Sequence, residues 1–129
     1  MRPALGWAAI ILVLCLTPGS ALPEWQWADL LSVDKFIHAA IFGILVLLLV
    51  RGFKGQAAGS TWAVRAAPIA AVIGVLYGAS MEGMQQIPGL GRHGDLLDLI
   101  ANTIGCLVAL IWLRWRRTEE RMSTETKDA

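Results

Sequence analysis

The chain has 129 residues, of which 56% are hydrophobic and 16% charged, and its formal net charge is +1. A composition this apolar, with so few charges, is typical of a membrane protein and argues against an ordinary soluble domain. Basic residues are not in marked excess over acidic ones, so we expect no nucleic-acid partner.

The first apolar stretch, residues 4–16, is shorter than the others and follows the single basic residue Arg2. It ends in Thr-Pro-Gly-Ser-Ala, so two interpretations are open. The stretch is either a retained membrane helix or a signal peptide with a small-residue cleavage site after Ala21. We expect a retained helix.

Three further apolar stretches cover residues 34–51, 65–82 and 96–113. Each approaches the roughly 20 residues that a helix needs to cross a hydrocarbon core. The sequence therefore predicts an all-α membrane protein, a compact bundle of four transmembrane helices formed by residues 1–117. Residues 118–129 are polar and lack apolar periodicity, so we expect a short disordered cytoplasmic tail.

The basic residues are distributed unequally between the two ends of these stretches. Lys35 and Arg92 fall on one side, and the other nine Lys and Arg residues fall on the opposite side: Arg2, Arg51, Lys54, Arg65, Arg114, Arg116, Arg117, Arg121 and Lys127. Because cytoplasmic segments of membrane proteins are enriched in Lys and Arg, we expect both termini to be cytoplasmic.

Small residues recur at four-residue intervals in two of the stretches. The rows are Ala70, Gly74 and Gly78, which continues to Glu82, and Ala101, Gly105 and Ala109. Such rows let membrane helices approach closely, so we expect Gly74, Gly78 and Gly105 to lie at helix contacts. The cysteines, Cys15 and Cys106, lie inside apolar stretches and are expected to be core residues without a disulfide.

Polar side chains also occur within the predicted spans, where an ionisable group costs roughly 2.5 to 3.5 kcal/mol near the helix centre. Residues three or four apart share one helix face. Three such pairs lie on different helices: Asp34 with His38, Glu82 with Gln85, and Asp98 with Asn102. The expected orientation brings all three pairs to the outward half of the bundle, where they would form a polar pocket.

Simpler interpretations exist for single residues. Lys35 is expected to extend to the headgroups, and Asp95 to cap the last helix. Arg92 would either bind a lipid phosphate or bridge to a carboxylate. His38, Glu82 and Asn102 fit a packing network and a ligand site equally well. Candidate metal ligands arrive singly from three helices, which is a weak signature, so we expect neither a metal nor a cofactor.

The order and spacing of these residues resemble the VanZ-like family of bacterial membrane proteins. The matching pattern covers about residues 18–113 and comprises Asp34, Lys35, His38, Glu82, Gln85, Arg92, Asp98, Asn102 and Gly105. One departure lies before Arg92, where two extra residues separate the arginine from the Pro-Gly pair of the loop. The resemblance implies a multi-pass protein of the bacterial cytoplasmic membrane.

The family takes its name from a member linked to resistance to a glycopeptide antibiotic, and its mechanism is not established. We expect an envelope protein whose outward pocket engages a lipid headgroup or a lipid-linked cell-wall precursor, with an antibiotic-resistance role as one expectation. The alternatives are a membrane-embedded enzyme acting on a lipid-linked substrate, an accessory subunit whose polar network only fixes helix packing, and a proton-coupled carrier. The oligomeric state does not follow from the sequence.

Overall fold

The computed structural model describes residues 1–17, 30–56, 61–87 and 95–127. Over these ranges the chain forms helices joined by short segments and no strand. The helices are α1 (Arg2–Leu16), α2 (Leu30–Gln56), α3 (Thr61–Gln85) and α4 (Leu96–Lys127). The predicted all-helical architecture is confirmed.

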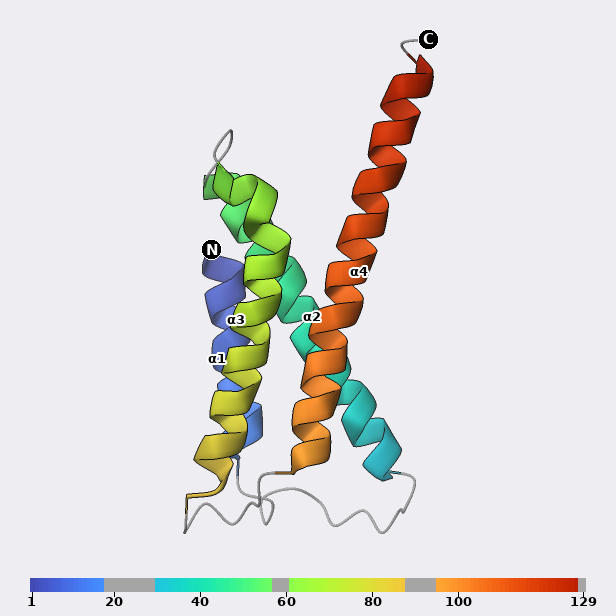
Figure 1. Ribbon diagram of the computed structural model, residues 1–129. Coiled ribbons are helices and arrows are strands. Elements are labelled where there is room, and N and C mark those ends of the chain that lie inside the picture. The colour runs from blue at the N-terminus through green and yellow to red at the C-terminus, as the bar shows by residue number, and fades with distance from the viewer. Residues whose placement is uncertain (18–29, 57–60, 88–94, 128–129) are drawn as a thin grey trace.

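Successive helices run in alternating directions (Figure 1). The two termini therefore lie toward the same end of the bundle, while the ends of α1 and α3 meet the beginnings of α2 and α4 at the other end. Helices α2, α3 and α4 pack against one another pairwise, and α1 packs against α2 and α3 but not against α4. Polar residues at the beginnings of α2 and α4 are thus brought beside the end of α3.

Three helices contain apolar segments long enough to cross a membrane, namely Asp34–Gly55, Arg65–Gln85 and Leu96–Lys127. Helix α1 is also apolar but has only 15 residues. Large apolar side chains such as Leu76 and Ile111 are exposed on the outer surface, as expected where lipid is the solvent. The chain is therefore a multi-pass membrane protein, with three long candidate spans and one shorter apolar helix.

The three long helices meet where their glycines allow close approach. A Cβ atom added to Gly74 would lie 2.7 Å from the Cys106 sulfur, and one added to Gly105 would overlap the backbone of Ala39. Gly78 likewise faces Phe42 and Asn102, both fully buried. The small-residue rows therefore lie at helix contacts.

Hydrogen bonds across the helix contacts hold α1 in place. The Trp7 indole donates to the Ile41 carbonyl (2.9 Å) on α2, and the Tyr77 hydroxyl on α3 donates to the Ala8 carbonyl (2.7 Å). Ile11 of α1 is fully buried in the shared core. Because buried polar groups in a bilayer must find partners within the protein, these bonds fix the rotation of α1 against the other helices.

The end of α4 differs from the sequence-based prediction. The predicted disordered tail is helical as far as Lys127, although its side chains are exposed. Threonine hydroxyls along this segment bond back to carbonyls one turn earlier, as Thr124 does to Glu120 and Thr126 to Met122. The segment also contains three glutamates, one arginine, one methionine and one lysine, which favour helices, and extending a formed helix requires no new nucleus.

Replacing Gly105 with alanine tests the close approach of α2 and α4. The new Cβ would meet the Ala39 carbonyl, a backbone group that cannot rotate away, so we expect a loss of about 1 to 3 kcal/mol in stability. Gly83→Ala is the matched control, since nothing lies within 4 Å of a Cβ there. Thermal melting of both variants in detergent measures the difference, and equal melting temperatures would contradict the packing described.

Candidate functional site

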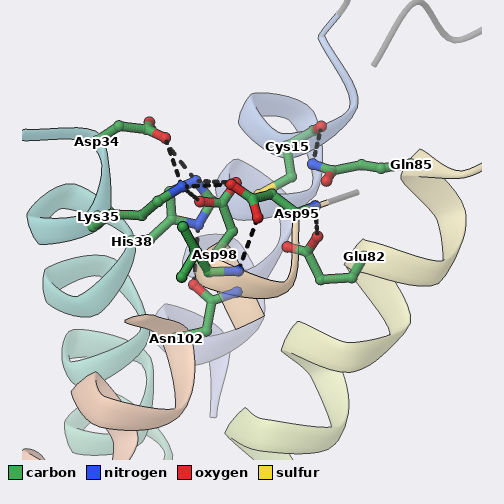
Figure 2. A network of polar contacts seen from close by, with 10 residues as sticks. Cys15, Asp34, Lys35, His38, Glu82, Gln85, Asp95, Asp98 and Asn102 are labelled. Atoms are coloured by element: carbon green, nitrogen blue, oxygen red, sulfur yellow. Dashed lines mark hydrogen bonds and ion pairs between the residues drawn. The ribbon is translucent and has the colours of Figure 1, made fainter. Parts of the chain in front are cut away.

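A polar cluster lies at the end of the bundle where α2 and α4 begin and α3 ends (Figure 2). Most of its residues are contributed by α2 and by the beginning of α4, with one glutamate from α3. The members of the cluster are Asp34, Lys35, His38, Glu82, Asp95, Asp98 and Asn102.

Lys35 is the centre of the ion pairs in this cluster. Its ammonium group donates a hydrogen bond to Asp95 (3.1 Å) and another to Asp98, and it lies 3.9 Å from Asp34. Its side chain is only 22% exposed. Lys35 thus pairs with carboxylates of the cluster, to which it was also assigned as a candidate. Helix α4 offers two carboxylates at its first turn, and these attract the ammonium group inward.

His38 and Asn102 form a buried pair below Lys35. The His38 Nδ1 atom lies 3.0 Å from the Asn102 Oδ1 atom, and both residues are buried. The other amide atom of Asn102, Nδ2, has no partner among the described residues. The carboxylate oxygens of Asp34 and Asp98 lie 3.9 and 4.0 Å from His38 Nε2, too far for a hydrogen bond.

Glu82 and Asp95 connect the end of α3 to the beginning of α4. The Glu82 carboxylate accepts a hydrogen bond from the Asp95 backbone N–H (2.9 Å), and the Asp95 carboxylate accepts one from the Leu97 N–H (2.9 Å). Asp95 is therefore the N-cap residue of α4, as predicted. The hydrogen bond from Leu97, followed by that from Lys35, lowers the pKa of Asp95 below its ordinary value.

Three further residues, Gln85, Arg92 and Asp95, are considered individually. Gln85 is buried, and its amide donates to the Cys15 carbonyl (2.8 Å), so it holds the end of α1 on α3. Arg92 lies outside the described residues. Asp95 joins the ion pairs although the sequence indicated it only as a cap. The position of Asp95 immediately before α4 and three residues before Asp98 is the sequence feature that could have predicted its ion pair with Lys35.

The described part of the cluster is acidic. Four carboxylates, those of Asp34, Glu82, Asp95 and Asp98, surround the single ammonium group of Lys35. Because Lys35 already contacts three of these carboxylates, it is poorly placed to bind a phosphate. Ligand atoms of Asp34, His38 and Asp98 lie within 4.8 Å of one another, close enough to share a metal ion.

An apolar groove of about 570 Å³ runs along the joint surface of α2 and α4. It begins at Phe36, next to Lys35, and extends to Trp112 on α4. Gly43 and Gly105 lie in its lining, where the two helices approach most closely. None of the cluster residues is among its lining residues, and the groove follows the apolar part of both helices.

Comparison with known proteins places this arrangement in a family. The family model described as VanZ/LLP1 matches residues 6–117. The chain belongs to the VanZ/LLP1 family. No curated protein and no solved structure shows significant similarity to it. The match spans the whole polar cluster, so the family resemblance seen in the sequence is confirmed, and the chain is a membrane protein of the VanZ/LLP1 family.

Replacing Lys35 with methionine tests its role in neutralising the cluster. The change leaves three carboxylates without their cation, and we expect a loss of about 1 to 3 kcal/mol in stability. Adding Asp98→Asn should recover part of that loss. Lys54→Met, at the exposed far end of α2, is the control. Thermal melting in detergent is measured for five proteins: the parent chain, Lys35→Met, Asp98→Asn, the double variant and the Lys54→Met control. Additive effects of Lys35→Met and Asp98→Asn would contradict the pairing.

Proposed function

We propose that this VanZ/LLP1 family member is a cell-envelope protein that binds the headgroup of a membrane lipid or of a lipid-linked cell-wall precursor. The observation that carries this proposal is that helices α2 and α4 form both an apolar groove and most of the polar cluster. The apolar groove between α2 and α4 begins at Phe36, and the polar cluster begins at the adjacent Lys35. An amphiphile with a polar head and a long apolar chain matches both surfaces at once.

The charges of the cluster indicate which chemical group of a lipid headgroup it would bind. Four described carboxylates and one lysine favour a positively charged group over a bare phosphate. An amino group of the headgroup, or a phosphate accompanied by a metal ion, satisfies this requirement. The carboxylates of Asp34 and Asp95, the more exposed ones, are the groups that an incoming ligand would meet first.

A second candidate function is a membrane-embedded enzyme acting on a lipid-linked substrate. The position of His38 favours it, since Nε2 faces two carboxylates at the mouth of the cluster without a hydrogen bond to either. A histidine held in this way can act as an acid or a base. A link to glycopeptide resistance rests on the family resemblance alone.

The distribution of basic residues supports an orientation for the bundle. Among the described Lys and Arg residues, only Lys35 lies at the end that carries the polar cluster. The others lie toward the opposite end or on the far half of α4. The positive-inside rule then orients the termini toward the cytoplasm and the polar cluster toward the outer face of the bacterial cytoplasmic membrane.

Thiol labelling in whole cells tests this orientation. Cysteines introduced at Gly55, at the end of α2, and at Gly91 lie on opposite sides of the proposed bundle. A membrane-impermeant reagent added outside should label the Gly91 variant only. The parent chain is the control, because its own Cys15 and Cys106 are buried. Labelling at Gly55 but not at Gly91 would reverse the orientation and move the cluster to the cytoplasmic face.

Native mass spectrometry of the full chain, released from detergent, tests the proposed ligand. We expect a retained lipid of defined mass, and Ala40→Trp should reduce its occupancy by about tenfold by filling the groove. Leu76→Trp is the matched control, because Leu76 is exposed on α3 outside the groove. Absence of a retained lipid, or equal loss in both variants, would count against the proposed function.

A further inference from the structure

In both Asp34 and Asp98, one carboxylate oxygen lies toward Lys35 and the other lies toward His38. Asp98 Oδ1 accepts the hydrogen bond from Lys35, while Asp98 Oδ2 lies 4.0 Å from His38 Nε2. Asp34 Oδ2 lies 3.9 Å from the Lys35 ammonium, while Asp34 Oδ1 lies 3.9 Å from His38 Nε2. One oxygen of each carboxylate is therefore left facing the imidazole.

The imidazole presents an acceptor to these two oxygens. Asn102 Oδ1 is an acceptor, so His38 Nδ1 must carry the hydrogen of their 3.0 Å bond. In the neutral ring, Nε2 then holds a lone pair. Asn102 is fixed in this position, since it is fully buried and packs against Gly78 on α3. A lone pair and two carboxylate oxygens therefore face one another, and a cation bound between them would be coordinated by all three.

The His38 side chain is only 9% exposed, and Nε2 has no described carboxylate within hydrogen-bonding distance. The buried ring is thus aimed at the gap without filling it. Lys35 does not fill the gap either, because it contacts the opposite oxygen of each carboxylate. The imidazole nitrogen and one oxygen of each carboxylate are thus available as ligands of a cation.

We propose that Asp34, His38 and Asp98 bind a divalent transition-metal ion. Their ligand atoms lie within 4.8 Å of one another, and zinc ligands at roughly 2.0 to 2.2 Å from the ion are separated by about 3.0 to 3.6 Å. Small side-chain rotations close that difference, and Asp34 is free to make them because its side chain is 53% exposed. One imidazole nitrogen and two carboxylate oxygens suit Zn²⁺ or Mn²⁺ better than Mg²⁺ or Ca²⁺.

The charges of the cluster accommodate such an ion. Lys35 offsets one of the four described carboxylates and a divalent ion offsets two more, which leaves a nearly neutral site. Three protein ligands leave coordination positions open on the exposed side of Asp34. A metal ion with an open coordination position accepts a phosphate oxygen. This last step rests on the proposed function and gives its headgroup a chemical class, a phosphate or pyrophosphate ester.

Isothermal titration calorimetry of the full chain, stripped with a chelator and titrated with Zn²⁺ alone, tests the site. We expect one ion per chain. His38→Gln and Asp34→Asn should each weaken binding by at least about tenfold, and Asn102→Ala, which frees the imidazole, by about 10 to 100-fold. Glu119→Gln is the control, because it removes an exposed carboxylate on the far part of α4 and leaves the three ligands. It should change the affinity by less than about threefold.

Thermal melting of each metal-free variant separates lost binding from lost folding. Asp34→Asn carries the most weight here, since Asp34 is exposed and contributes little to the core. Failure of the wild-type chain to bind Zn²⁺, or equal weakening by Asp34→Asn and Glu119→Gln, would overturn the metal site.

Repeating the lipid measurement with and without chelator distinguishes this inference from the proposed function. If Zn²⁺ binds and the chelator releases the lipid, the metal holds the headgroup. A lipid retained by a chain that does not bind Zn²⁺ overturns the metal site and leaves the proposed function standing. Zn²⁺ binding to a chain that retains no lipid supports the metal site and contradicts the lipid ligand.

Discussion

The network around Lys35 is the interaction on which this end of the molecule depends. An ammonium group near an apolar helix must find partners inside the protein, and here α4 supplies them from Asp95 and Asp98. The bonds join residues about 60 positions apart in the chain and tie the beginning of α2 to the beginning of α4. Glu82 then ties α3 to the same point through the Asp95 backbone.

The glycine contacts let the helices approach closely enough for this network to form. The backbone of Ala39 packs directly against Gly105. The absence of a side chain at Gly78 leaves room for Asn102. Close backbone approach brings His38 and Asn102 within hydrogen-bonding distance, and the resulting pair orients the imidazole toward Asp34 and Asp98. The glycine contacts in the middle of the bundle therefore help to determine the orientation of His38 at its end.

The site combines two properties that rarely serve the same ligand. The groove along α2 and α4 is apolar, whereas the cluster beside it is acidic. A phosphate-bearing lipid matches the groove but is repelled by the carboxylates. A divalent ion between Asp34, His38 and Asp98 reconciles the two properties, since it converts the acidic end into an anion acceptor.

The sequence by itself determined the features that repeat along one helix. Apolar length predicted the long helices, four-residue spacing placed Gly74, Gly78 and Gly105 at contacts, and helical period put Asp34 with His38 on one face. Only the tertiary structure decided the direction of Lys35, the turning of Gln85 toward α1 and the pairing of His38 with Asn102. These depend on how each helix is rotated about its axis, which is set by contacts between distant segments that no local pattern records.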